Sequence, residues 1–319
     1  MTRYDVFNGD ADGICALIQL RLAEPASTEL ITGVKRDIGL LERIRASAGD
    51  EILVLDVSMD TNGPALRRLL EEGARVRYFD HHFPGEIPDH AGLEAVIDTA
   101  PETCTSLLVD AALDGRFRPW AIVAAFGDNL ASSARAAAEG LGLSDAQLER
   151  LEMLGICINY NGYGSTLEDL HIHPAALYRQ LVAYASPLDL IGDADSPLTL
   201  LEAGYLEDMN RAAAADLLLE TPAAAALVLP DEAWARRVSG VYGNDLANAH
   251  PERAHAVLTS GADGSWRISV RAPLARRSGA DVLCRRWPTG GGRSAAAGIN
   301  ALPADDLDAF LADFSTHWA

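Results

Sequence analysis

Acidic residues and a pair of histidines stand where predicted strands end, and this repeated placement is the most informative feature of the sequence. Each of these positions ends, or directly follows, an apolar run that is typical of a buried β-strand. The carboxyl ends of parallel strands meet at one edge of an open α/β sheet, where such folds bind ligands. We therefore expect one cleft to collect the side chains of Asp10, Asp12, Asp56, Asp80, His81, His82 and Asp128.

A cleft of this composition requires cations. Several carboxylates at close range repel one another unless positive charge lies between them. Carboxylate oxygens combined with an imidazole suit Mn²⁺ or Mg²⁺ better than Zn²⁺, which favours more histidine or cysteine ligands. The residue types thus predict a metal centre for Mn²⁺ or Mg²⁺.

Alternating strand and helix patterns would position these side chains. The sequence predicts short strands at 4–8, 30–34, 52–57, 74–79, 94–98 and 120–126, and helices at 13–24, 37–48, 61–73 and 103–114. Such alternation indicates βαβ units, and hence an α/β fold with a mostly parallel sheet flanked by helices. On the turn after the first strand, Gly9 and Gly13 would let Asp10 and Asp12 both face the cleft.

Beyond residue 130 the composition changes twice. Residues 131–220 are rich in alanine and leucine and predict mostly helices. A connector helix, split by Thr221-Pro222, is expected over 212–219 and 223–229. From about residue 236 the pattern predicts a smaller α/β domain. We expect a metal-binding domain at 1–190, a helical connector at 191–235 and a smaller C-terminal domain at 236–319.

The charge of the chain limits its partners. The 319 residues include 26 Lys and Arg residues, of which Lys35 is the only lysine, against 46 Asp and Glu residues, for a formal net charge of −20. Long nucleic acids are bound through many phosphate contacts from Lys and Arg, so we do not expect a long nucleic acid as a partner. No apolar run is long enough to predict a membrane span, and no signal segment is expected. Four scattered cysteines are typical of a reducing compartment, which favours a cytoplasmic location.

The order of the motifs resembles that of the DHH phosphoesterase superfamily, which includes RecJ-type exonucleases, nanoRNases, exopolyphosphatases and family-two inorganic pyrophosphatases. Near the C-terminus, Thr289–Gly298 resembles the glycine-rich signature of the DHH-associated substrate-binding domain, and Ile268–Ala272 resembles its Ser-x-Arg strand. The resemblance is weak at residues 140–235. The N-terminal motifs that carry it are Asn8-Gly-Asp-Ala-Asp-Gly13, Ile52-Leu-Val-Leu-Asp56, Asp80-His-His82 and Ala124-Ala-Phe-Gly-Asp128.

The resemblance implies two metal ions, with Mn²⁺ as the ion and Mg²⁺ as the alternative. Asp56 would bridge the ions. Asp12, His81 and Asp128 would complete one of them, and Asp10 would bind the other. The ions would lower the pKa of a water molecule that attacks phosphorus.

The remaining motif residues would support this chemistry. Asn8 stands where RecJ-like members carry an acid, and its amide oxygen would offer a metal ion a neutral ligand. Asp80 would orient the histidines without binding metal itself. His82 would reach the phosphate of the substrate or the leaving oxygen.

The C-terminal signature implies a phosphate grip. Gly290, Gly291 and Gly292 would let backbone N–H groups approach a phosphate, and Arg293 would pair with it through two hydrogen bonds. Family members usually carry histidine at the position of Arg293. Arginine does not titrate in proteins, which favours charge binding over proton transfer at this position. Arg271, on the strand before, would be a second phosphate contact.

Three functions fit these observations. The leading hypothesis is a Mn²⁺-dependent phosphodiesterase that acts on short oligonucleotides or nucleotide phosphates. The first alternative is a pyrophosphatase or exopolyphosphatase, and the second is a catalytically silent DHH domain that serves as a binding scaffold. Loss of motif acids would favour the scaffold, but only the Asn8 position departs from the pattern. The sequence leaves the substrate length and the oligomeric state open, a homodimer included.

Overall fold

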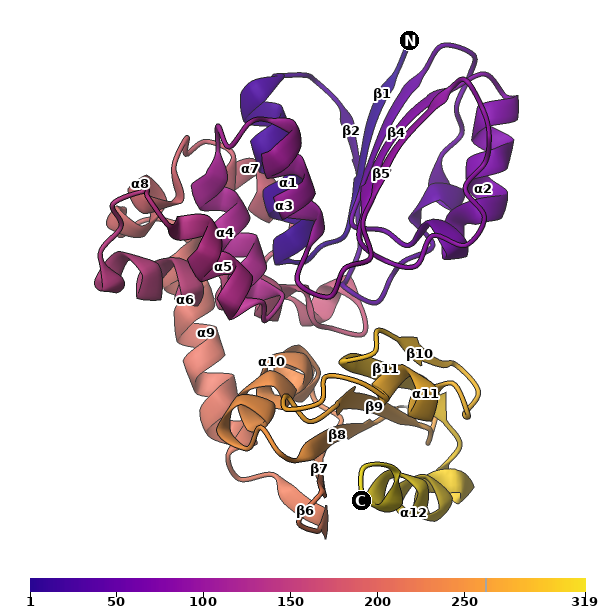
Figure 1. Cartoon of the computed structure of the whole chain (residues 1–319), viewed down its shortest axis with the longest axis vertical. Coiled ribbons are helices and arrows are strands. Elements are labelled where there is room, and N and C mark those ends of the chain that lie inside the picture. Colours follow the sequence, from indigo (N-terminus) through magenta and orange to yellow (C-terminus); the bar gives the residue numbers. More distant parts are fainter. Residues whose placement is uncertain (262) are drawn as a thin grey trace. The chain divides into compact units, whose positions relative to one another are not determined.

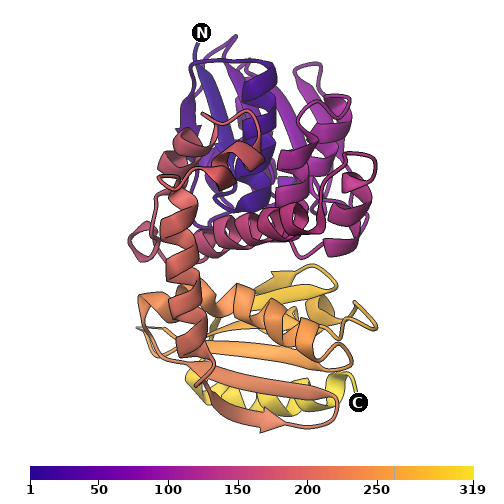
Figure 2. The same cartoon turned by 90° about the vertical axis from the view of Figure 1, so that its left-hand side faces the viewer.

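Two compact units make up the computed structural model, which describes residues 1–261 and 263–319. Unit 1 is Met1–Ala203 and unit 2 is Gly204–Ala319, so the boundary between them lies inside helix α9 (Pro197–Ala212). Each unit is a β-sheet with helices packed on its faces (Figures 1 and 2). Among the described residues, no helix combines the length and the apolar composition that crossing a lipid bilayer would require.

Unit 1 is built on a five-stranded, all-parallel sheet with the order β2-β1-β3-β4-β5. Its strands are β1 (Arg3–Phe7), β2 (Glu29–Ile31), β3 (Glu51–Leu55), β4 (Arg75–Asp80) and β5 (Leu93–Ile97). Helices α1 (Ala11–Ala23) and α3 (Thr105–Ala112) lie on one side of the sheet, and α2 (Met59–Glu71) lies on the other (Figure 1). The remaining helical elements are η1 (Leu40–Arg43), α4 (Arg118–Gly127), α5 (Ala131–Ala138), α6 (Asp145–Gly162), η2 (Leu167–Asp169), α7 (Pro174–Leu181) and α8 (Pro187–Gly192).

Alternation along the strands builds the core on the α2 side of this sheet. Val6, Val54 and Tyr78 point to that side and pack with Leu66 and Leu70 of α2, and all five are buried. Side chains alternate between the two faces of a strand, so this packing fixes the register of β1, β3 and β4. It thereby fixes where the three strands end, and the motif residues follow directly at those ends.

Unit 2 is built on a six-stranded mixed sheet with the order β10-β11-β9-β8-β7-β6, in which only the β7–β8 pair is parallel. Its strands are β6 (Asp216–Glu220), β7 (Ala224–Leu229), β8 (Ala254–Ser260), β9 (Trp266–Arg271), β10 (Gly290–Gly292) and β11 (Ala296–Leu302). Helices α10 and α12 cover opposite faces of the sheet (Figures 1 and 2). The helical elements that follow α9 are α10 (Ala233–Ala249), α11 (Ala280–Cys284), η3 (Ala304–Asp306) and α12 (Leu307–His317).

The fold class predicted from the sequence is confirmed: a parallel sheet flanked by helices, followed by a second α/β domain. Two local predictions in unit 1 are wrong. Residues 120–126, predicted as a strand, lie inside α4, and every one of them is buried. A helix that is buried on all sides has no polar face, so its periodicity does not distinguish it from a buried strand. Residues 37–48, predicted as a helix, contain only the short η1.

The predictions around the unit boundary and the glycine-rich signature also need correction. Residues 212–219 and 223–229, predicted as a split connector helix, form most of the antiparallel pair β6–β7. Alanine and leucine favour helices, but pairing within a sheet overrides this preference. The glycine-rich signature predicts a loop followed by a helix start near Ala295, but Gly290–Gly292 forms β10 and Ala296 begins β11.

Candidate metal centre

The carboxyl ends of three neighbouring strands supply most of the candidate site. Asp10 and Asp12 follow β1, Asp56 follows β3, and Asp80 is the last residue of β4. Asp128 comes from the C-terminus of α4 and not from a strand as predicted, because the run before it is a buried helix. The structure nevertheless brings Asp128 to the same place as the strand-end acids.

His81 lies at the centre of this group. Its Nε2 is 3.3 Å from Asp56 Oδ1, 3.8 Å from Asp12 Oδ2 and 3.8 Å from Asp128 Oδ2. Its Nδ1 lies 3.0 Å from the carbonyl oxygen of Thr103, which can only accept a hydrogen bond. Nδ1 therefore donates this hydrogen bond, and Nε2 is the ring nitrogen that faces the three carboxylates. A nitrogen lone pair among carboxylate oxygens is the donor set of a divalent cation.

The first turn of α3 holds Asp12 in place. The backbone N–H of Thr105 donates to Asp12 Oδ2 at 2.7 Å, and the N–H of Ser106 donates to Asp12 Oδ1 at 2.7 Å. The amino end of a helix offers unpaired N–H groups and a partial positive charge, both of which stabilise a carboxylate. Burial nevertheless outweighs these bonds and the nearby His81, and it raises the pKa of Asp12.

Asp56 reaches the site through an unusual backbone conformation. Its φ is +58°, in the left-handed region that aspartate tolerates better than most residues. Its N–H donates to the carbonyl of Phe79 at 3.1 Å, which ties the end of β3 to β4. Burial, followed by the charges of Asp10 and Asp12, raises the pKa of Asp56 well above its usual value. A cation beside this carboxylate would relieve that cost.

Asp80 contacts both histidines but lies outside the group of candidate metal ligands. Its Oδ1 accepts the backbone N–H of His81 at 2.9 Å and is 2.7 Å from Nδ1 of His82. Asp80 is fully buried, whereas the side chain of His82 is 30% exposed. A carboxylate accepts at Nδ1, so Nε2 of His82 is the atom that would meet a substrate. The orienting role of Asp80 stays a prediction.

Lys35 is a member of the site that the sequence analysis did not include. Its ammonium group forms an ion pair with Asp10 Oδ2 and lies 3.4 Å from Asp128 Oδ1 and 3.0 Å from Asn159 Oδ1. Burial would lower the pKa of Lys35, but Asp10 and then Asp128 raise it well above its usual value. Burial would likewise raise the pKa of Asp10, but Lys35 holds it below its usual value.

Asn8 lies at the same edge with one polar atom unpaired. Its amide nitrogen donates to the carbonyl of Lys35 at 3.3 Å. Its Oδ1 is buried and accepts no hydrogen bond from any residue in the described part of the chain. A buried polar atom without a partner is costly, and an oxygen of this kind suits a cation.

The glycines of the first motif pack closely; none of them adopts a positive φ. A Cβ at Gly9 would lie 2.0 Å from the carbonyl oxygen of Gly33, and a Cβ at Gly13 would lie 2.3 Å from that of Asn8. Asp10 is the N-cap of α1, with Gly13 N–H donating to its Oδ1 at 3.0 Å. The motif therefore combines a helix start with two carboxylates.

The predicted phosphate contact Arg271 lies in unit 2 and is held by neutral groups. Its Nε donates to Asn244 Oδ1 at 2.5 Å and its Nη2 to the Gly240 carbonyl at 3.0 Å. Its Nη1 donates to Ser269 Oγ at 3.0 Å and to the Val270 carbonyl at 3.1 Å. Arg271 is buried, so most of its N–H groups are engaged within the protein. Its role in binding substrate stays a prediction.

Backbone packing accounts for two of the three glycines in the glycine-rich signature. A Cβ at Gly290 would lie 1.8 Å from the carbonyl oxygen of Cys284, and Gly292 has a φ of +134°. A Cβ at Gly291, by contrast, would meet no described atom within 4 Å. Arg293 follows directly and is half-buried. The phosphate-binding role of these four residues is untested.

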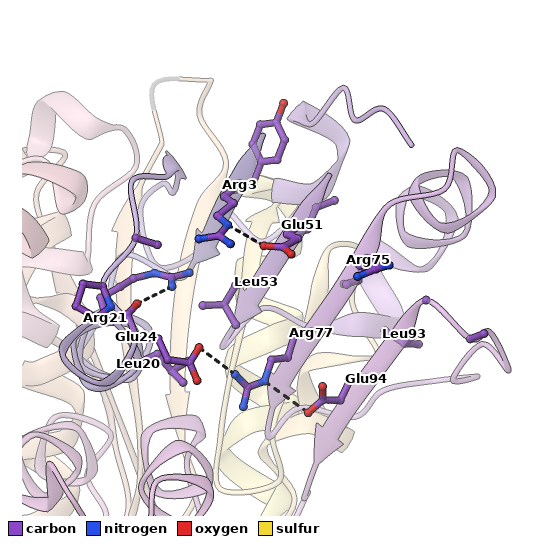
Figure 3. Close-up of a pocket in the computed structure, with 17 residues that line it drawn as sticks. Arg3, Leu20, Arg21, Glu24, Glu51, Leu53, Arg75, Arg77, Leu93 and Glu94 are labelled. Carbon is purple, nitrogen blue, oxygen red and sulfur yellow. Dashed lines mark hydrogen bonds and ion pairs between the residues drawn. The ribbon is translucent and has the colours of Figure 1, made fainter. Parts of the chain in front are cut away.

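A cavity of about 400 Å³ lies in another part of unit 1. It is lined by residues near the amino ends of the strands and by the end of α1, including Arg3, Arg21 and Arg77 (Figure 3). Arg3 pairs with Glu51 at 2.8 Å, and Arg77 lies 3.5 Å from Glu94. Most of its charged groups neutralise one another, and none of the candidate metal ligands lines it.

The sequence contained a signal for Lys35, since it is the only lysine in the chain. A single residue forms no pattern, however, and nothing in the sequence placed it beside Asp10. Asn159 and Thr105 were not predicted either, because both come from helices that no motif marks. Their membership in the site depends on how α3 and α6 pack against the sheet.

Comparison with known proteins identifies the fold. No protein-family model matches the chain, and no curated protein sequence matches it. Among solved structures, the exonuclease RecJ bound to manganese is similar over 99% of this chain and 90% of that chain, with 20% identity and a TM-score of 0.60. RecJ from Thermus thermophilus in complex with Mn²⁺ gives 22% identity and 0.60, over 99% of this chain and 52% of that chain.

A pGpG-specific phosphodiesterase, PggH from Vibrio cholerae, is similar over 99% of this chain and 100% of that chain, with 14% identity and a TM-score of 0.54. The similarity in each case extends across both units. The chain therefore has the fold of the DHH-domain proteins, as the motif order predicted.

Proposed function

We propose that this protein is a Mn²⁺-dependent phosphodiesterase that hydrolyses short oligonucleotides or nucleotide phosphates. The observation that carries the proposal is the position of His81 Nε2, which lies within 3.8 Å of carboxylate oxygens from three aspartates with buried side chains. This donor set is incomplete without a cation, and it lies at the carboxyl edge of the sheet, where such folds bind ligands.

Four residues would hold the ion: Asp12, Asp56, His81 and Asp128. They offer carboxylate oxygens and one imidazole nitrogen, which suits Mn²⁺, with Mg²⁺ as the alternative. When bound, the ion supplies an activated water and neutralises charge on the phosphoryl group. The Thr105 and Ser106 N–H groups fix Asp12, so that these ligands are held in place before the ion binds.

The remaining residues would handle the substrate. Asp80 fixes the proton of His82 at Nδ1, which presents Nε2 to the leaving oxygen or to a non-bridging phosphate oxygen. Lys35 would add a fixed positive charge near the phosphate. Arg271 and Arg293 of unit 2 would contribute to binding the rest of the substrate, Arg293 by direct pairing.

Two observations support a short substrate. The net charge of −20 opposes the many phosphate contacts that a long nucleic acid needs. The structures with the same fold include a phosphodiesterase specific for the dinucleotide pGpG. A dinucleotide is short enough to be held by local arginines in spite of the overall negative charge.

A substrate panel tests the proposal. Purified protein is stripped of metal, supplied with Mn²⁺ or Mg²⁺, and assayed on a nitrophenyl nucleotide ester, linear dinucleotides, a cyclic dinucleotide, pyrophosphate and polyphosphate. We expect the highest kcat/KM on a linear dinucleotide with Mn²⁺. Pyrophosphate or polyphosphate as the best substrate would replace the phosphodiesterase with the phosphatase alternative. No hydrolysis of any substrate at any metal concentration would favour a binding scaffold.

A further inference from the structure

Lys35 occupies a position that is built for a cation. Three oxygens converge on its ammonium group: Asp10 Oδ2, with which it forms an ion pair, Asp128 Oδ1 at 3.4 Å and Asn159 Oδ1 at 3.0 Å. The side chain of Lys35 is 18% exposed, and the two carboxylates are 2% and 5% exposed. Two carboxylates and an amide oxygen are hard ligands of the kind that Mn²⁺ and Mg²⁺ prefer.

Asp10 is the residue that a second metal ion would need most, and it is already engaged. Its Oδ1 accepts the Gly13 N–H as the cap of α1, and its Oδ2 pairs with Lys35. Asn8 replaces a carboxylate with a neutral amide at the same edge, and its Oδ1 is left without a partner among the described residues. A second ion would therefore have one carboxylate fewer to bind, because of Asn8. It would also compete with the positive charge of Lys35.

The remaining ligands fit a single ion. The groups of side chains in the described part of the chain that could hold a metal are Asp56-His81-His82 and Asp12-His81-Asp128. Both groups contain His81, whose Nδ1 is taken by the Thr103 carbonyl. Nδ1 of His82 is engaged by Asp80. One nitrogen atom of His81 binds one ion, so the two groups describe one centre, bounded by Asp12, Asp56, Asp128 and His81.

We propose that Lys35 is a built-in second cation, so that the centre binds one Mn²⁺ ion beside a protein ammonium group instead of two ions. The inference rests on the proposed function and revises the two-ion expectation. A single Mn²⁺ and Lys35 together bring three positive charges to Asp10, Asp12, Asp56 and Asp128. A second divalent ion would have to sit beside the ammonium group and repel it.

The proposal predicts the number of bound ions, which can be measured without activity. Metal-free protein is titrated with Mn²⁺ by calorimetry, and electron paramagnetic resonance of the loaded protein distinguishes an isolated Mn²⁺ from a spin-coupled pair. The test variant is Lys35→Met, which keeps an unbranched apolar side chain of similar shape and removes the ammonium group. The matched control is Lys35→Arg, which keeps the charge. Thermal unfolding confirms that each variant is folded.

We expect one Mn²⁺ per chain and a six-line spectrum in the wild type and in Lys35→Arg. Lys35→Met is expected to bind two ions per chain and to show spin coupling, because Asp10, Asn159 and the unpaired Asn8 Oδ1 become ligands. Two ions in the wild type would overturn the inference and leave the proposed function intact. One ion in folded Lys35→Met would show that Lys35 does not exclude the second. No binding by the wild type would refute the metal centre itself.

Discussion

Two charged regions of this protein, the candidate metal centre of unit 1 and the surroundings of Arg271 in unit 2, differ in how completely their buried charges are paired. In unit 1, the carboxylates of Asp12, Asp56 and Asp128 lie within 3.8 Å of His81 Nε2, and Lys35 pairs with Asp10 and lies beside Asp128. In unit 2, the buried Arg271 is surrounded by hydrogen-bond acceptors that the protein itself supplies. The first region is electrostatically incomplete, and the second is nearly complete.

This difference indicates where chemistry takes place. Burying a charge is costly unless it is paired, so a region that leaves buried carboxylates near one another is stable only with a bound cation or with protons. A region in which a buried arginine is satisfied by carbonyl and amide oxygens needs no ligand to be stable. The aspartates of unit 1 are therefore expected to depend on metal, whereas Arg271 is expected to contribute to stability as much as to binding.

The largest expected effect is a loss of activity caused by substitutions in unit 1. Asp56→Asn and His81→Ala should each lower kcat/KM by at least about a thousandfold, because each removes a ligand of the ion that stabilises charge in the transition state. Asparagine tolerates the left-handed backbone of Asp56, so the fold should survive. Initial rates with Mn²⁺ measure the effect, and the exposed Asp305→Asn is the control. A folded Asp56→Asn protein with most of its rate would refute the site.

Substitutions in unit 2 should have smaller effects on activity, and these effects should distinguish the role of Arg293 from that of Arg271. Arg293→Ala should lower kcat/KM on a dinucleotide roughly tenfold to a hundredfold, since an arginine–phosphate pair contributes on the order of 1.5–3 kcal/mol. Its Tm should change little. Arg271→Ala should lower the Tm as well, because it leaves the Asn244 and Gly240 oxygens without a donor.

Steady-state kinetics and thermal unfolding of both variants make this comparison, with the exposed Arg285→Ala as the control. The smaller pyrophosphate should be less sensitive to Arg293→Ala than a dinucleotide is. Equal losses on both substrates would contradict a contact with the distal part of the substrate. An unchanged Tm for Arg271→Ala would contradict the structural role assigned to it.

The orienting role of Asp80 should give an effect of about tenfold on kcat. Asp80→Asn keeps an oxygen for the His81 N–H and weakens the bond to His82. If Asp80 acts through His82, its substitution should change kcat much less in a His82→Ala background than in the wild type. A double-mutant cycle measures this coupling. Additive losses would mean that Asp80 acts independently of His82.

Metal dependence should also appear in thermal stability, and this change in Tm is the smallest effect that we predict. The raised pKa of Asp56 means that this carboxyl favours the fold below about pH 3.9, its usual value, and loses that contribution as the pH rises through the folded-state pKa. At pH 7 without metal, Asp56→Asn should therefore raise the Tm by about 2–4 °C for each kcal/mol removed. Mn²⁺ should raise the Tm of the wild type much more than that of Asp56→Asn. A lower Tm for the metal-free variant would argue against electrostatic cost at this site.

The sequence predicted the parts of this site that depend on local pattern. Strand ends are marked by apolar runs, so Asp56 and Asp80 could be placed at the carboxyl edge of the sheet before the structure was known. Asp128 was assigned to the site from a predicted strand that is in fact the buried helix α4. The order of the motifs was the second ground for that assignment, and it does not depend on the secondary structure.

The parts that depend on tertiary packing could not be predicted. Lys35 lies in the segment after β2 and meets Asp10 and Asn159 only because α6 packs beside the turn after β1. In the same way, β6 and β7 have the composition of helices and become strands through pairing in the sheet. Local propensity is a weak guide where neighbouring elements supply most of the stabilisation.

The central claim is that the aspartates around His81 form the metal centre, and anomalous diffraction at the manganese edge tests it most directly. Crystals of the wild type and of Asp56→Asn would be equilibrated with Mn²⁺ and measured under the same conditions. We predict a strong anomalous peak bounded by Asp12, Asp56, His81 and Asp128 in the wild type, and a weak or missing peak in Asp56→Asn. A wild-type protein with no peak there, or with manganese bound only elsewhere, would contradict the account.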